Sequence, residues 1–130
     1  MKYLYTATIV KRDSGKYEAR IPDIPHCVTS GRDEAEAIEM IADAACSMLT
    51  VYEDEGMAIP AASAPGSIPA PDGGFVSVLS LDTDQHRMVY DTRTVRKSVS
   101  IPAWMDKLAQ KQGVSCSKVL QDALRVRLGV

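Results

Sequence analysis

Residues 15–37 read GKYEARIPDIPHCVTSGRDEAEA, and this stretch decides how the first part of the chain folds. Within it, residues 17–21 alternate apolar and polar side chains, a pattern typical of a strand. A second alternating run, rich in Tyr, Thr, Ile and Val, occupies residues 3–11. The turn residues Asp13-Ser14-Gly15 join the two runs, so the sequence predicts a hairpin over residues 3–21.

The end of the quoted stretch predicts a short strand and then a long helix. Prolines at 22 and 25 cannot donate to a sheet, so the chain must leave the ladder before a third strand at residues 27–29. Asp33 can cap a helix, and Glu36 three residues later completes a capping-box pattern. Gly56 is the expected stop. Apolar residues at steps of three and four mark the face expected to be buried: Ile38, Ile41, Ala45, Met48 and Tyr52.

The first domain is expected to close with one more strand. Residues 59–74 hold four prolines and predict a long irregular connection. Residues 75–81 alternate again and predict a fourth strand that ends at Asp82-Thr83-Asp84. Residues 1–84 are therefore expected to form a β-β-β-α-β domain, with one helix packed on one sheet, which places the chain in the α+β class.

The tail differs in kind from the first domain. Residues 95–101 alternate as a strand, and Pro102 fits the first position of a helix. That helix is expected to end at Gly113, and Ser115 can cap a second one. Both tail helices carry apolar stripes, formed by Trp104, Met105, Leu108 and Ala109 in the first and by Val119, Leu120, Ala123, Leu124 and Leu128 in the second.

Charge is distributed unevenly along the chain. Residues 1–84 hold 6 Lys/Arg and 14 Asp/Glu, a balance of −8, whereas residues 85–130 hold 9 and 3, a balance of +6. This asymmetry indicates two partners of opposite charge. No apolar run approaches the roughly 20 residues that span a bilayer, and the N-terminus does not resemble a signal peptide, so we expect no membrane partner and a cytoplasmic protein.

Cysteine usage predicts neither a disulfide framework nor a metal site. Cys27, Cys46 and Cys116 are odd in number and widely spaced, and no C-x-x-C motif is present. His26 beside Cys27 lacks a second pair of ligands, so we expect a structural role at a strand end. No cofactor and no metal are expected.

The tail strand needs a partner that its own chain does not offer. An isolated strand is not stable in water, and two short helices cannot bury both their stripes and that strand. A second copy solves this problem, with the two strands paired antiparallel across a two-fold axis and four helices closing the core. The sequence therefore predicts a homodimer, or a tetramer formed by two such dimers. The expected dimer core is Val99, Ile101, Trp104, Leu108, Leu120 and Leu124.

The order strand, Pro-started helix, Gly, Ser-x-Ser, helix resembles the ribbon-helix-helix family of DNA-binding proteins. The resemblance implies that residues 91–130 place a two-stranded ribbon in the major groove of double-stranded operator DNA. By position, the base readers are Arg96, Ser98 and Ser100. The phosphate contacts, at the start of the second helix and beside the ribbon, are Lys97, Ser115, Ser117 and Lys118.

Two other interpretations of the tail stay open. Residues 108–115 also fit a helix-turn-helix, whose recognition helix would present Cys116, Ser117, Lys118 and Gln121. A strand comes first and no third helix is present, which argues against it. The tail could also serve dimerisation alone, although its basic excess favours DNA.

The first domain resembles the HicB antitoxin family. The matching pattern is a G-x-Y strand at residues 15–17, P-D-x-P at 22–25, C-x-T-x-G at 27–31, and a helix that opens into the Glu36-Ala37 pair. The resemblance implies a partial ribonuclease-H-like fold, a HicA-type ribonuclease toxin as partner, and repression of the chain's own operon. The alternative is a stand-alone transcriptional regulator whose first domain senses a ligand or another protein.

Charge supports the toxin interpretation, because a toxin that grips RNA should be basic and an acidic surface would attract it. The acidic residues off the buried stripe of the long helix are the expected toxin contacts: Glu34, Glu39, Asp43 and Glu53.

Enzyme activity is not expected. Two-metal chemistry needs several carboxylates converging on one pocket. The candidates are Asp13, Asp23, Asp33 and Asp43, and turn or cap roles explain the first three. The chain has no G-x-S-x-G, no H-E-x-x-H and no nucleophile beside an evident base.

Overall fold

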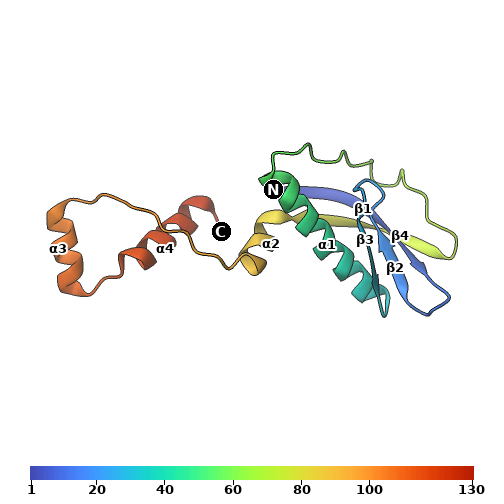
Figure 1. The fold of residues 1–130 in the computed structure, drawn as a ribbon, viewed down its shortest axis with the longest axis horizontal. Helices are drawn as coiled ribbons and strands as arrows, with labels where there is room; N and C mark the ends of the chain where they lie inside the picture. Colours follow the sequence, from blue (N-terminus) through green and yellow to red (C-terminus); the bar gives the residue numbers. More distant parts are fainter. The chain divides into compact units, whose positions relative to one another are not determined.

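The predicted hairpin is present in the computed structural model, which describes residues 1–130. It forms part of a four-stranded antiparallel sheet with the order β3-β2-β1-β4. β1 (Lys2–Lys11) and β4 (Gly74–Asp82) are long, whereas β2 (Tyr17–Arg20) and β3 (Val28–Gly31) have four residues each. Figure 1 shows α1 lying across this sheet. The α+β class is confirmed.

The chain divides into two units, residues 1–93 and 94–130, which are described separately. The first unit contains the sheet, α1 (Glu34–Asp54) and α2 (Thr83–Tyr90). The order β-β-β-α-β agrees with the prediction, and α2 extends it. The second unit contains α3 (Ala103–Gln112) and α4 (Cys116–Leu128).

The start of α1 follows the capping pattern. The Asp33 carboxylate accepts a hydrogen bond from the Glu36 amide at 2.8 Å. The Glu36 carboxylate in turn accepts from the Arg32 backbone amide at 3.3 Å and pairs with the Arg32 guanidinium at 2.7 Å. The helix ends at Asp54, two residues before the predicted stop at Gly56. Glu55 is its C-cap, and Gly56 has a φ of +66°, a conformation that favours glycine.

The core of the first unit lies between α1 and one face of the sheet. Alternation along β1 turns Tyr5, Ala7 and Ile9 toward the helix, and all three are buried. The predicted helix face is correct at its centre but rotated, because Ile38 and Met48 pack only at its edge. The buried residues of α1 are Ala37, Ile41, Ala45, Cys46 and Leu49.

The proline-rich connection is tied to the core at two points. The Tyr5 hydroxyl donates to the Pro60 carbonyl. Asp23 accepts from both the amide and the hydroxyl of Ser63, at 2.7 and 2.8 Å. Asp23 was expected to serve only its own turn, and the structure shows that it also anchors a segment 40 residues away.

The helix α2 was not predicted. Asp82 ends β4, as expected, and its carboxylate also caps α2 by accepting from the amides of Asp84 and Gln85 at 3.0 and 3.3 Å. The first unit therefore continues to Arg93, beyond the boundary at residue 84 drawn from the sequence.

The helices of the second unit begin and end close to the predicted residues. Pro102 precedes α3, and Gly113 ends it with a φ of +68°. The Ser115 hydroxyl accepts from the Lys118 amide at 3.3 Å and caps α4. No side chain of either helix is buried.

The strand predicted at residues 95–101 is not formed in the single chain, where residues 91–102 have no regular secondary structure. The sequence predicted this strand only as one of a pair from two copies, and a single chain offers it no ladder partner. Pairing between two copies remains a prediction.

None of the helices combines the length and the apolar character that spanning a bilayer requires.

Gly31 gives a direct test of how α1 sits on the sheet. A Cβ atom on Gly31 would lie 2.4 Å from the backbone nitrogen of Ala37, so α1 must shift to admit it. We expect Gly31→Ala to lower the free energy of unfolding by about 1–3 kcal/mol, the usual cost of overpacking. The neighbouring Ser30→Ala is exposed and should change it by less than about 0.5 kcal/mol. Urea denaturation measures both, and equal stabilities would contradict this packing.

Candidate functional site

An acidic surface lies on the exposed side of α1. Glu34, Glu39 and Asp43 are exposed, as the sequence predicted. A hydrogen bond to the Glu34 carboxylate raises the pKa of the Tyr17 hydroxyl, which places Glu34 beside β2. Glu39 and Asp43 lie four residues apart on the helix, so they share one face. This surface can attract a basic partner.

Glu53 does not belong to that surface. Its side chain is only 18% exposed and accepts hydrogen bonds from the Tyr3 hydroxyl at 3.0 Å and the Thr83 hydroxyl at 2.8 Å. Burial, and then this bond to Glu53, raise the pKa of Tyr3. The carboxylate also pairs with Arg87 at 3.3 Å. Glu53 therefore joins β1, α1 and α2, and we withdraw it from the expected toxin contacts.

Arg87 holds α2 against the end of α1. Its guanidinium donates to Asp54 at 2.9 Å, to Glu53 at 3.3 Å and to the Thr50 carbonyl at 3.3 Å. The bond to Asp54 is the main reason that the pKa of Arg87 is raised. Also on α2, the centroid of the His86 ring lies 4.5 Å from the centroid of the Tyr90 ring. The His86 Nε2 atom lies 3.3 Å from the Ser47 hydroxyl of α1.

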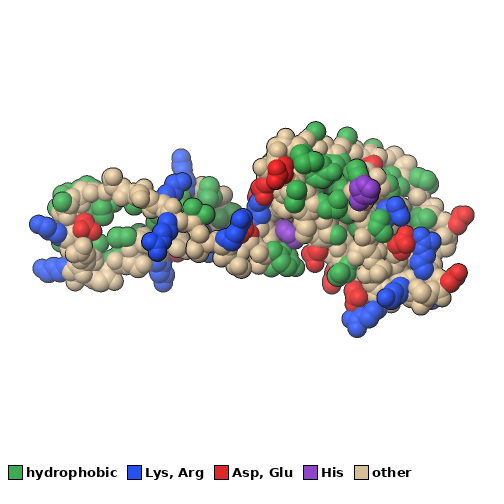
Figure 2. Space-filling model, viewed as in Figure 1, with side chains coloured by type: hydrophobic (Ala, Val, Ile, Leu, Met, Phe, Trp, Pro, Cys, Tyr) green, Lys and Arg blue, Asp and Glu red, His purple; other side chains and the backbone are tan.

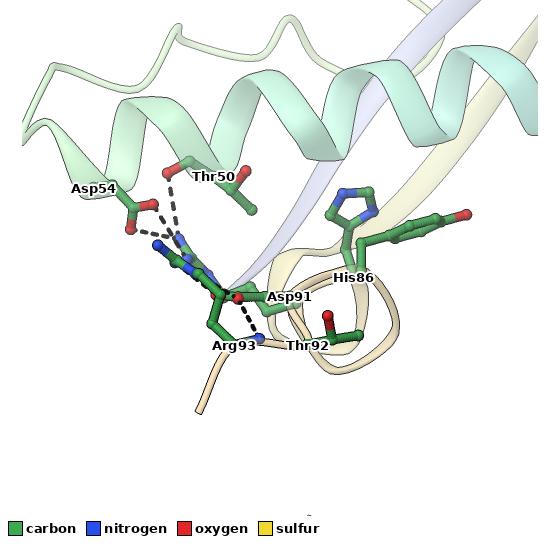
Figure 3. Close-up of a pocket in the computed structure, with 8 residues that line it drawn as sticks. Thr50, Asp54, His86, Asp91, Thr92 and Arg93 are labelled. Carbon is green, nitrogen blue, oxygen red and sulfur yellow. Dashed lines mark hydrogen bonds and ion pairs between the residues drawn. The ribbon is translucent and has the colours of Figure 1, made fainter. Parts of the chain in front are cut away.

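Between these groups lies an open hollow of about 320 Å³. In Figure 3, Thr50 and Asp54 lie at one end of the hollow, where they face guanidinium groups, and His86 lies at the other end. Asp91 and Arg93 pair at 2.8 Å on its rim, and this pairing lowers the pKa of Asp91 to about 2. The charged groups of the hollow are thus paired with one another.

Sequence patterns did not reveal Arg87 or the role of Glu53, because their partners lie 30 or more residues away. One local signal could have found α2. Asp82 is followed three residues later by Gln85, which repeats the acid–x–x–Gln form of a capping box.

The second unit brings several predicted DNA contacts together. Arg96, Lys97 and Ser98 line a hollow of about 660 Å³ together with Ser117 and Gln121 of α4. Lys118 follows Ser117 at the capped start of the helix, and Ser100 lies further along the segment, outside this hollow. Residues 94–130 hold seven Lys/Arg and two Asp/Glu, a balance of +5, and Figure 2 shows mainly Lys and Arg among the charged side chains of this unit.

The apolar residues predicted for a dimer core all lie uncovered in the single chain. A second hollow, of about 620 Å³, is lined by apolar side chains from the segment and both helices, among them Val99, Ile101 and Leu120. Figure 2 shows an opening in this unit with hydrophobic side chains beside it. The exposed fractions are 59% for Val99, 44% for Ile101, 62% for Trp104, 47% for Leu108, 37% for Leu120 and 47% for Leu124.

The residues weighed for metal binding are dispersed. No group of three or more His, Cys, Asp or Glu side chains could hold a metal ion. Cys27 is buried beside an exposed His26, and burial raises the pKa of the Cys27 and Cys46 thiols. Asp33 is a helix cap, and Asp43 is exposed on α1.

Fold and sites together define a class: a two-unit α+β protein with a self-contained acidic unit and a basic helical unit that lacks a core of its own. A family model described as HicB_like antitoxin of bacterial toxin-antitoxin system matches residues 5–124. The chain belongs to this family and is an antitoxin of a toxin–antitoxin system. No curated protein sequence matches it.

Solved structures share the fold at low sequence identity. A chain of a toxin–antitoxin complex from Streptococcus pneumoniae is 21% identical, with a TM-score of 0.59 and 98% of this chain and 99% of that chain covered. The antitoxin HicB of Burkholderia pseudomallei is 22% identical, with a TM-score of 0.56 and 94% and 96% covered. A chain of a HicA3 and HicB3 toxin–antitoxin complex is 23% identical, with a TM-score of 0.50 and 62% and 99% covered.

The contacts of Arg87 predict how firmly α2 is held. Replacing Arg87 with Met keeps the length of the side chain but removes its bonds to Asp54, Glu53 and the Thr50 carbonyl. We expect a loss of about 1 kcal/mol in local stability, because these groups are partly exposed. Amide hydrogen exchange in residues 83–90 should then become about fivefold faster. Arg93→Met, which removes only the pair with Asp91, should leave that exchange unchanged, and equal effects of the two variants would contradict this role of Arg87.

Proposed function

We propose that the first unit neutralises a HicA-type ribonuclease toxin and that a dimeric second unit represses the chain's own operon by binding double-stranded operator DNA. Membership of the antitoxin family supports the first part. The observation that carries the second is the combination of a +5 charge with two amphipathic helices that bury no side chain.

The uncovered apolar surface supports a ribbon-helix-helix dimer. In this arrangement residues 95–101 pair antiparallel with the same segment of a second copy, which supplies the missing ladder. Because side chains alternate, Val99 and Ile101 then face the shared core, where Trp104 and Leu120 join them. Each fully buried side chain of this size contributes about 1.5–3 kcal/mol, so a handful from each copy can hold the dimer.

The opposite side of the ribbon then faces DNA. Arg96, Ser98 and Ser100 read bases in the major groove, where Arg can make a bidentate contact to guanine. Ser115, Ser117 and Lys118 meet phosphate at the start of α4, because free amide groups and the helix dipole favour an anion there. Lys97 adds a further phosphate contact. In the single chain, the hollow that Arg96, Ser98 and Ser117 share is also lined by Leu120 and Leu124 of the predicted dimer core.

The acidic surface of α1 is the proposed site for the toxin. Glu34, Glu39 and Asp43 are exposed, and the first unit as a whole holds eight Lys/Arg and fifteen Asp/Glu. The electrostatic field of these negative charges would speed the association of a basic ribonuclease. Apolar contacts must supply most of the affinity, because exposed ion pairs contribute little. Because a HicA-type toxin and operator DNA are both cytoplasmic partners, the proposed location of the chain is the cytoplasm.

A stand-alone regulator that senses a ligand is the second candidate. The hollow between α1 and α2 is the observation that would favour it. Its guanidinium and carboxylate groups are paired with each other, as in Arg87 with Asp54 and Arg93 with Asp91, so they do not point to a small-molecule ligand. The antitoxin function is therefore preferred.

The base-reading role of Arg96 can be tested on the operator. Arg96→Ala should weaken binding to the operator by about 1–3 kcal/mol, the usual worth of a bidentate base contact. Lys118→Ala should weaken binding to operator and unrelated DNA alike and reduce the salt slope by about 1. Fluorescence anisotropy at several salt concentrations measures both.

These variants also separate the two modes of DNA binding. If changes at Lys118 and Gln121 alter sequence preference while changes at Arg96 and Ser98 do not, the helix-turn-helix is the correct description of the tail.

The toxin-binding role of the first unit can be tested without the tail. Residues 1–93 close their own core, so this fragment should neutralise the toxin encoded beside the gene but fail to repress transcription. Co-expression followed by growth and co-purification measures neutralisation, and a reporter fused to the operator measures repression. Growth arrest despite a soluble fragment would mean that the tail is needed to neutralise the toxin.

Charge reversal on α1 tests the surface itself. The double variant Glu39→Lys, Asp43→Lys should slow association with the toxin about tenfold at low salt, because steering depends on the local field. The control Asp13→Lys, Asp72→Lys makes the same change of net charge at exposed turns elsewhere in the unit. Equal rates for the two variants in stopped-flow binding would show that α1 is not the contact surface.

A further inference from the structure

The outer face of α1 carries apolar residues that the fold of one chain does not use. Met40 and Val51 lie on this face and are 45% and 55% exposed. Residues 40, 44, 47 and 51 follow at steps of four, three and four, so Ala44 and Ser47 share the face with them. The opposite side of the helix holds the residues that pack on the sheet, Ala37, Ile41, Ala45 and Leu49. The outer face is therefore uncovered in the single chain.

Helix stability does not explain these side chains. Valine is a poorer helix former than alanine, because its branched side chain loses rotamer freedom in a helix. Val51 therefore weakens the helix slightly and gains little from burial. Apolar or small residues at steps of four and three form the kind of face on which another helix packs. The small residues Ala44 and Ser47 leave room for a partner between Met40 and Val51, which lie about 16 Å apart along the axis.

Charge at the border of this face indicates the partner. Every ion pair of α1 involves Arg32 or Arg87. Glu39 and Asp43, each next in sequence to a residue of the apolar face, take part in no ion pair. These free carboxylates fit a helix whose apolar stripe is bordered by Lys or Arg. A second copy does not fit, because two first units, each with a balance of −7, would bring like charges together here.

We propose that one helix of the basic toxin packs along this face, with Met40 and Val51 as the apolar anchors and Glu39 and Asp43 at the charged border. The contact rests on the proposed toxin-neutralising function, and it adds the residues that give the complex its lifetime. Charged residues at a rim act mainly on the rate of association, whereas buried apolar anchors act on the rate of dissociation. The two sets of residues are therefore separable by kinetics.

Truncation of the anchors tests this assignment. In the full chain, Met40→Ala and Val51→Ala should each speed dissociation from the purified toxin about tenfold, as the loss of a well-packed anchor does, and should change the association rate by less than about twofold. Neither change alters the net charge, so the effect should not depend on salt concentration. The matched control Val28→Ala, which shortens a 40% exposed side chain on β3, should change neither rate. Stopped-flow mixing and surface plasmon resonance measure the two rates.

A larger residue at the centre of the face tests how closely the partner helix approaches. Ala44→Gln adds bulk without charge and suits a helix, and it should weaken the complex at least about tenfold because the partner can no longer come as near. The matched control Ala35→Gln lies at an exposed position of the same helix outside this face and should have no effect. Circular dichroism and urea denaturation confirm that the variants fold, and light scattering confirms that their mass is unchanged.

The outcomes separate this contact from the function on which it rests. If the wild-type chain does not bind the toxin, the proposed function is wrong and the contact with it. If charge reversal at Glu39 and Asp43 slows association while the Met40 and Val51 variants dissociate as slowly as the wild type, the contact alone is wrong. A change in mass or in DNA binding at unchanged toxin binding would also overturn it, because the face would then belong to a second copy or to the tail. If Ala44→Gln fails to fold, the two anchor variants decide alone.

Discussion

The burial of apolar surface is the constraint on which the whole molecule depends, and the two units meet it differently. The first unit closes its core within one chain, with α1 packed on the face of the sheet that carries Tyr5, Ala7 and Ile9. The second unit has no buried side chain in α3 or α4. A helix pair with an exposed tryptophan and several exposed leucines is not a stable end point for a protein in water. This deficit is the reason for proposing that two copies share the core of the second unit.

The first unit also shows how one carboxylate can organise elements that are distant in sequence. Glu53 accepts from Tyr3 at the start of β1 and from Thr83 at the start of α2, and it shares Arg87 with Asp54. A partly buried carboxylate with several donors is well satisfied, so it has little to offer an external partner. The acidic character of α1 thus has two parts, an exposed surface, which is the proposed toxin site, and an internal junction that holds α2.

Local patterns predicted most of the first unit and the break between the two helices of the second unit. Alternation located the strands, the Asp33–Glu36 pair located the start of α1, and Gly113 and Ser115 located the break between the tail helices. The patterns did not predict how α1 is rotated about its own axis, and so which of its residues face the sheet. A helix that lies on a sheet buries a wider face than a narrow apolar stripe suggests. This is why Ala37 and Leu49 are buried while Met48 packs at the margin.

The candidate sites were predictable only in part, for a physical reason. Exposure of Glu34, Glu39 and Asp43 follows from their position on the helix, and the sequence predicted it. The internal role of Glu53 depends on partners 30 to 50 residues away, which no local pattern reveals. The segment 95–101 depends on another molecule, so the sequence pattern predicted a strand that one chain by itself does not form.

The central claim, that the tail builds its core from two chains, can be tested on the chain's single tryptophan. Trp104 is 62% exposed in the isolated chain. If two copies share a core, its fluorescence at high protein concentration should lie at a shorter wavelength than that of tryptophan in water and should resist quenching by iodide. Both properties should be lost on dilution, together with a fall in mass. A Trp104 that is freely quenched in the assembled protein, or one that stays buried in a monomer, would contradict the account.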